Sequence, residues 1–131
     1  MSMFQKKDEF LKLKHWAVLG ATNNQDKYGY KIVKELKDRG YIVYPVNPKY
    51  ETICDLKCFD SIEDLPNDVE VVDIIVNREI VVKSLKKIKE IGIEKVWFQP
   101  NTYNPEIVKL ADSLNLDCVY RFCVYAELKN S

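Results

Sequence analysis

Short, continuous apolar runs alternate along the chain with longer segments in which apolar residues recur at helical spacing. A run such as Trp16–Leu19, which ends at Gly20, is typical of a strand that is buried on both faces. In the segment 30–39, by contrast, the apolar residues share one helical stripe. The pattern predicts strands over 16–19, 41–44, 69–76, 95–98 and 116–119, helices over 4–13, 30–39, 77–91 and 104–114, and one helical turn over 61–65.

Individual residues mark the ends of these helices. Asn77 and Asn104 stand where a helix N-cap belongs, and a proline at the first helical position follows Asn104. Gly40 and Gly92 stand where a helix C-terminal glycine belongs.

Strict alternation of strands and helices predicts right-handed crossovers onto a parallel sheet. We expect a single α/β domain over residues 1–131, with a leading helix within residues 1–13. Its doubly wound parallel sheet would have about five strands in the order 3-2-1-4-5, with helices on both faces. Ligands of such sheets bind beyond the carboxyl ends of the strands, near the switch point, which this order places between the first and fourth strands.

Composition and charge narrow the choice of partner. The 131 residues suffice for one domain, and 47% hydrophobic residues argue against long disorder. Twenty basic residues balance twenty acidic ones, so no broad attraction to nucleic acid or to an anionic membrane is expected. Any site for an anion must therefore be local.

The start of the chain and the length of its apolar runs predict a cytoplasmic protein. No apolar run reaches the roughly 18 residues that a membrane span needs, and the start lacks the features of a signal peptide. The four cysteines should therefore be reduced thiols. Their spacing and the single histidine, His15, argue against a zinc site.

The loop after the first strand has features of a phosphate site. Gly20 lets the backbone turn sharply, and the small residues Ala21 and Thr22 let a ligand approach the main chain. The loop leads into a helix N-terminus, whose free amides favour a phosphate, while Lys27 adds a charge and Gly29 allows close approach. The loop is longer than that of the G-x-G-x-x-G fingerprint, so an ordinary strand-to-helix connection is the alternative.

The end of the second strand separates classes of nucleotide. Binders of NAD usually carry an acidic residue here to hold the ribose hydroxyls, but no carboxylate occurs before Glu51. Lys49 instead offers a cation that suits a phosphate on the ribose. The alternative is that Asn47, Pro48 and their neighbours only form a rigid turn.

In combination, these motifs resemble the coenzyme A (CoA)-binding domain family, which is similar to the N-terminal domain of the succinyl-CoA synthetase alpha subunit. The family commonly has a glycine soon after the segment that matches Trp97–Gln99, where this chain has Pro100 and Asn101. The resemblance covers about residues 14–128 and is carried by Val18–Thr22, Lys27–Gly29, Tyr44–Lys49, Val72–Ile75, Val96–Gln99 and Cys123.

The resemblance implies a Rossmann-like domain that holds CoA in an extended groove across the strand ends. Two segments would contact the nucleotide, the first loop at the diphosphate and the second strand end at the adenosine with its 3′-phosphate. The residues implied are Gly20, Ala21, Thr22 and Lys27 at the diphosphate, Tyr28 and Gly29 at the start of the helix, Asn47, Pro48 and Lys49 at the adenosine, and Asn77 and Gln99 along the rest of the groove.

Catalytic machinery is not evident in the sequence. His15 lies at the entry to the first strand, the wrong end for the ligand. Asp73 lies inside an apolar strand, where we expect a buried, hydrogen-bonded structural residue. Cys123, after the fifth strand, is a candidate reactive thiol, although a free cysteine is usually a small buried hydrophobe.

We therefore predict a non-enzymatic protein that binds CoA or an acyl-CoA as a carrier, sensor or partner subunit. The alternatives are a module that binds NADP or NAD, and an interaction domain that has lost its ligand. A homodimer or a partner protein is compatible with exposed strand edges.

Overall fold

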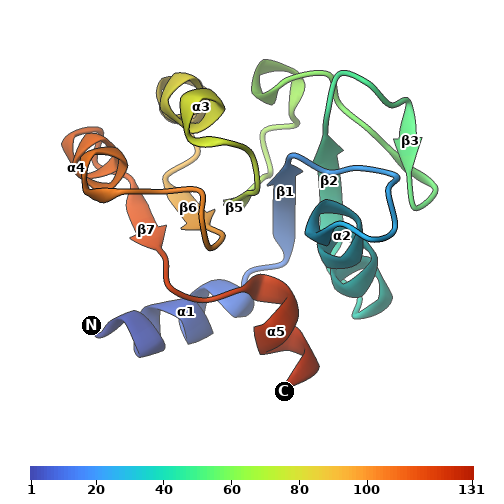
Figure 1. Cartoon of the computed structure of the whole chain (residues 1–131), viewed down its shortest axis with the longest axis horizontal. Helices are drawn as coiled ribbons and strands as arrows, with labels where there is room; N and C mark the ends of the chain where they lie inside the picture. The colour runs from blue at the N-terminus through green and yellow to red at the C-terminus, as the bar shows by residue number, and fades with distance from the viewer.

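The computed structural model describes residues 1–131 and shows a central sheet with helices on both faces (Figure 1). None of the helices combines the length and the apolar character that crossing a bilayer requires. The elements are α1 (Met3–Leu11), β1 (His15–Leu19), α2 (Tyr28–Asp38), β2 (Ile42–Val46), β3 (Thr52–Ile53), β4 (Leu56–Lys57), the short 3-10 helix η1 (Ile62–Asp64), β5 (Val71–Ile74), α3 (Arg78–Glu90), β6 (Lys95–Phe98), α4 (Pro105–Ser113), β7 (Asp117–Val119) and α5 (Val124–Lys129).

The main sheet is parallel and doubly wound, which confirms the predicted α/β class. Its strands lie in the order β2-β1-β5-β6-β7, so the predicted order 3-2-1-4-5 is wrong. The third predicted strand, β5, pairs with β1 on the side away from β2, with Val18 opposite Asp73. Numbered along the chain, the five strands of the sheet therefore follow the order 2-1-3-4-5.

Pro45 explains why no strand lies outside β2. Its carbonyl accepts a hydrogen bond at 2.9 Å from the Phe59 amide, so Pro45 faces the outer edge, where a proline has no N–H to offer. The Asn47 amide in turn donates to the Phe59 carbonyl at 2.9 Å. A single bridge from Phe59 to Val46 thus occupies this edge in place of a full strand.

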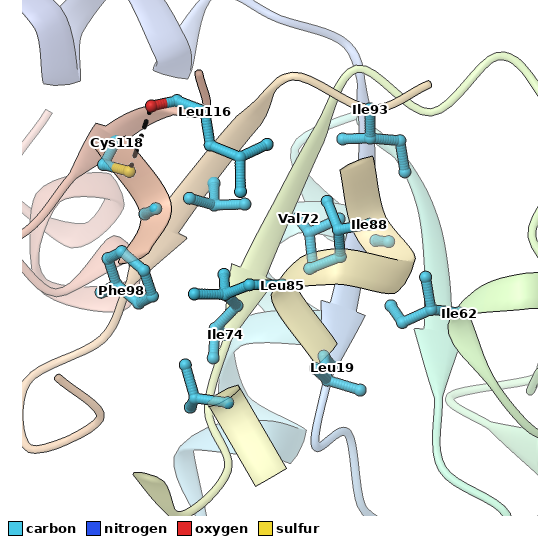
Figure 2. Close-up of a cluster of buried hydrophobic side chains, with 14 of the residues drawn as sticks. Leu19, Ile62, Val72, Ile74, Leu85, Ile88, Ile93, Phe98, Leu116 and Cys118 are labelled. Carbon is cyan, nitrogen blue, oxygen red and sulfur yellow. Dashed lines mark hydrogen bonds between the residues drawn. The ribbon is translucent and has the colours of Figure 1, made fainter. Parts of the chain in front are cut away.

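Each face of the sheet packs against its own set of helices. Helices α3 and α4 and the η1 turn cover one face, where Leu85 and Ile88 meet Val72 and Ile74 (Figure 2). Helices α1, α2 and α5 cover the other face (Figure 1). The apolar cluster on this face contains both buried tryptophans, Trp16 and Trp97. The alternating side chains of one strand therefore contribute to two separate apolar clusters.

The helix ends agree with the cap residues in the sequence. The Asn77 Oδ1 accepts from the Ile80 amide at 3.1 Å, and the Asn104 Oδ1 accepts from the Ile107 amide at 2.8 Å. Gly40 follows α2 with a φ of +88°, the left-handed conformation expected of a residue that ends a helix.

Some boundaries differ from the prediction, and three elements were not predicted. Strand β2 continues through Pro45, because the proline faces the edge of the sheet. Helix α2 begins at Tyr28, two residues before the predicted start. The unpredicted elements are the two strands of the hairpin β3–β4 and the short helix α5. The two hairpin-turn residues, Cys54 and Asp55, have φ values of 51° and 63°, which glycine or asparagine more often adopts.

Candidate functional site

The observed strand order moves the switch point of the sheet. Because β5 lies beside β1, the order reverses between the first and third strands, not between the first and fourth as predicted. The α2 connection leaves β1 toward one face, and α3 leaves β5 toward the other. The carboxyl ends of β1 and β5, at Gly20 and Ile75, are therefore where a ligand is expected.

Gly20 and Gly29 bring the end of β1 into direct contact with the start of α2. Gly20 has a φ of +98°, and a Cβ built there would lie 2.3 Å from the Ile75 carbonyl oxygen. A Cβ on Gly29 would lie 2.4 Å from the Gly20 carbonyl oxygen and 3.3 Å from the Thr22 Cγ2. No residue with a side chain fits at either position without moving the backbone.

The N-terminus of α2 presents unused hydrogen-bond donors. The amides of Tyr28 and Gly29 precede the first intrahelical bond and donate to no acceptor in the chain. Lys27 occupies the N-cap position without a side-chain cap bond, and its side chain is exposed. Free amides, the positive end of the helix dipole and a lysine together favour an anion.

Asn47 joins this loop to the end of β2. Its side-chain nitrogen donates to the Ala21 carbonyl at 2.9 Å, and its side-chain oxygen accepts from the Lys49 amide at 2.9 Å. Pro48 and Lys49 are exposed, and the Lys49 ammonium forms no ion pair within the chain. This link sets Lys49 at the same end of the sheet as the α2 N-terminus.

Two clefts flank Gly20, one on each side of the strand end. The β2 cleft, of about 380 Å³, is lined by Leu19, Gly20, Val46, Asn47, Pro48, Lys49, Asp60, Ser61, Ile62, Glu63, Val76, Ile80, Ser84 and Lys87. The α2 cleft, of about 430 Å³, is lined by Gly20, Thr22, Asn24, Lys27, Tyr28, Gly29, Tyr50 and Ile75. Eight of the eleven predicted binding residues therefore line one cleft or the other: Gly20, Thr22, Lys27, Tyr28, Gly29, Asn47, Pro48 and Lys49.

The other three predicted residues lie outside these clefts. The Ala21 side chain is fully buried, so only its main chain lies near the site. Asn77 caps α3 and borders a separate, open polar hollow beside Arg78 and Asn101. Gln99 is only 3% exposed. The structure thus does not bring Asn77 and Gln99 together with the first loop.

Gln99 instead holds the start of α5. Its side-chain oxygen accepts from the Val124 amide at 3.0 Å, and its nitrogen donates to the Cys123 Sγ at 3.2 Å. Cys123 is half-buried at the N-cap of this helix and lines neither cleft. Its reactivity remains a prediction.

Sequence reasoning missed several residues of the clefts. Ile80 belongs to the predicted apolar stripe of α3, yet it is 44% exposed and faces the β2 cleft. Tyr50 lines the α2 cleft, and its hydroxyl lies 3.0 Å from the Thr22 hydroxyl. Glu63 and Lys87 reach the β2 cleft from η1 and α3. Glu63 belongs to the helical turn predicted over 61–65, but no local pattern indicates that it pairs with Lys87, a lysine 24 positions later.

The most perturbed carboxyl group lies away from both clefts. Burial raises the pKa of Asp73 well above its ordinary value, and neither of its carboxyl oxygens has a hydrogen-bond partner. Asp73 is buried as predicted, but the prediction that it is hydrogen-bonded is wrong, because only apolar strand neighbours surround it. At the opposite end of the sheet from the clefts, a hydrogen bond from His15 holds the pKa of Glu70 below its ordinary value. His15 therefore has a structural partner and lies far from the strand carboxyl ends.

The parallel doubly wound sheet, with a glycine-dependent loop, free helix amides and two clefts across the strand ends, is typical of α/β domains that bind nucleotides. The sequence model of the CoA binding domain family matches residues 14–129. The chain belongs to this family.

Several relatives are enzymes much longer than the segment that this chain matches. The chain is 39% identical over 98 residues to the ADP-forming acetate–CoA ligase II of Archaeoglobus fulgidus, a match that covers 73% of this chain and 15% of the ligase. It is 34% identical over 90 residues to the alpha subunit of the ADP-forming acetate–CoA ligase II of Pyrococcus furiosus, covering 68% of this chain and 20% of that subunit. The chain therefore matches only a fifth or less of these ligases.

A solved structure of similar size has the same fold. A hypothetical protein from Pyrococcus horikoshii is 34% identical, with a TM-score of 0.89 over 99% of this chain and 92% of that one. The Rossmann-like fold and the membership of the CoA-binding domain family, both implied by the sequence resemblance, are confirmed.

Proposed function

We propose that this chain binds CoA or an acyl-CoA across the two clefts and that it acts without catalysis of its own, as a carrier, a sensor or a partner subunit. The observation that carries the proposal is the meeting of both clefts at Gly20, beside the free amides of α2 and the unpaired Lys49. One extended nucleotide would cross the strand ends at that glycine.

The charge distribution suits the orientation of the ligand. The diphosphate would lie at the N-terminus of α2, where the Tyr28 and Gly29 amides donate and Lys27 adds a charge. The adenosine would lie in the β2 cleft, whose apolar lining includes Ile62 and Val76. Lys49, at the rim of that cleft, would contact the 3′-phosphate.

The partner-subunit role is supported by the relatives. The chain matches a small part of each ligase, and the Pyrococcus furiosus relative is itself one subunit of an enzyme. A domain that holds CoA for chemistry on another chain needs a binding groove rather than a nucleophile and base. We therefore place any acyl transfer on a partner and leave binding to this chain.

Calorimetric titration with CoA, dephospho-CoA, NAD and NADP tests the proposal. We expect CoA to bind most tightly, and Lys49→Met to weaken CoA about tenfold while it leaves dephospho-CoA unchanged. Lys109→Met, on the exposed surface of α4, is the matched control and should leave every affinity unchanged. Equal weak binding of all four ligands would refute the proposal, and a preference for NADP would select the dinucleotide alternative.

A further inference from the structure

The rim of the β2 cleft carries more charge than Lys49 alone. Lys87 on α3 and Glu63 on η1 also line the cleft, and they form an ion pair with Nζ and Oε1 3.1 Å apart. This pair connects two elements that are 24 positions apart in sequence and that both border the cavity. No motif in the sequence and no part of the family resemblance includes either residue.

The pair is well placed to exchange partners. The side chains are 51% exposed for Lys87 and 54% exposed for Glu63, and ion pairs so exposed to water are weak. A phosphate monoester carries close to two negative charges at neutral pH and accepts stronger charge-assisted hydrogen bonds than a single carboxylate. A phosphate that enters the cleft can therefore take Lys87 from Glu63 at little cost.

The positive charge of Lys49 alone does not balance the two negative charges of such a phosphate. Lys49 supplies one positive charge from the end of β2, whereas Asp60 and Glu63 place two carboxylates on the same rim. Lys87, released from Glu63, supplies the second positive charge from the α3 side. The lining of the cleft also includes the apolar residues Leu19, Ile62 and Val76, so the cleft combines apolar surface for a flat ring with charged groups for a phosphate.

We infer that Lys87 is the second ligand of the ribose phosphate, and that Glu63 competes with the phosphate for Lys87 and so sets the selectivity of the site. A ligand without this phosphate leaves the ion pair intact and gains nothing from Lys87. A ligand with it must displace Glu63. The inference rests on the proposed function, because it names the residues by which that site distinguishes CoA from dephospho-CoA.

Affinities of CoA and dephospho-CoA for three variants, measured by titration calorimetry, test this assignment. Lys87→Met should weaken CoA about tenfold and leave dephospho-CoA unchanged. Glu63→Gln should instead tighten CoA about threefold, again without effect on dephospho-CoA, because a competing charge is removed. Lys86→Met is the matched control, since Lys86 is exposed on the same helix and lines neither cleft.

The outcomes separate this inference from the proposed function. If the wild-type protein binds CoA but Lys87→Met weakens both ligands equally or neither, the role of Lys87 is refuted and the proposed function stands. The same holds if Lys86→Met has the effect expected of Lys87→Met, since a general charge effect would then explain both. If the wild-type protein does not bind CoA, the proposed function is refuted, and the inference is refuted with it. Thermal unfolding of each variant confirms that it is folded, because the loss of an exposed ion pair costs little stability.

Discussion

Asp73 is a carboxyl group whose removal should stabilise the protein. It lies in the middle of β5, between Val18 of β1 and Trp97 of β6, and it is fully buried. Neither carboxyl oxygen has a partner, and leaving a buried polar group unsatisfied costs about 1–3 kcal/mol. Leucine has the same branching as aspartate but is larger. We expect the removal of the unsatisfied carboxyl group to outweigh the packing cost of the added volume, so Asp73→Leu should raise the free energy of unfolding by up to about 1–3 kcal/mol.

The effect should grow with pH, and the sign follows from the raised pKa. The unfolded chain releases the Asp73 proton near the ordinary value of 3.8, whereas the folded protein retains it to a higher pH. The contribution of Asp73 to stability is therefore complete below that value and is lost as the pH rises, with a slope of at most about 1.4 kcal/mol per pH unit. Asp73→Asn removes this titration but keeps a buried polar group of the same shape.

Urea unfolding followed by tryptophan fluorescence measures both variants, because Trp16 and Trp97 are buried on the same face of the sheet. We expect Asp73→Asn to match the wild-type protein near pH 4 and to exceed it increasingly as the pH rises above that value. Asp73→Leu should be more stable at every pH. A stability difference between Asp73→Asn and wild type that does not change with pH would refute the reasoning, as would a less stable Asp73→Leu.

Three further outcomes follow from close contacts in the structure. Gly29→Ala should lower the free energy of unfolding by about 1–3 kcal/mol, because the new Cβ would lie 2.4 Å from a backbone oxygen; an unchanged melting temperature would contradict this. Gln99→Leu leaves the Val124 amide without its acceptor and should lower the free energy of unfolding in urea by about 1–3 kcal/mol; an unchanged free energy would contradict this. Burial raises the pKa of Cys118 to about 12, so mass spectrometry after iodoacetamide treatment should find Cys118 modified after the half-buried Cys54 and Cys123. Faster modification of Cys118 than of Cys123 would show that β7 opens readily.

The local pattern of the sequence was enough for most elements and for the first loop. The apolar runs predicted all five strands of the main sheet, and Asn77 and Asn104 predicted the starts of two helices. Both kinds of signal are local, because a helix cap and a buried strand are each determined by residues that are close together in the sequence. Where the family has a glycine, Asn101 takes a φ of +73°, which asparagine tolerates. Residue type alone therefore indicates the turn after β6.

The strand order, and the part of the β2 cleft formed by η1 and α3, depend instead on packing between segments that are far apart in the sequence. Pro45 carried a usable signal, since a proline inside a strand indicates a sheet edge, and that reading would have excluded a neighbour outside β2. The Lys87–Glu63 pair had no such signal, because it joins separate elements that only the fold brings together. Gln99 follows an apolar strand, so a groove position and a buried position were equally compatible with the sequence.

The proposed binding of CoA at the Gly20–Gly29 loop is tested most directly by amide NMR spectra recorded during a CoA titration. We expect saturable shifts that are largest for the amides of Thr22 in the loop after β1, of Tyr28 and Gly29 at the start of α2, and of Lys49 after β2. Amides near His15, at the opposite end of β1, should not change. Shifts that fail to saturate, or that concentrate away from the two clefts, would contradict the account.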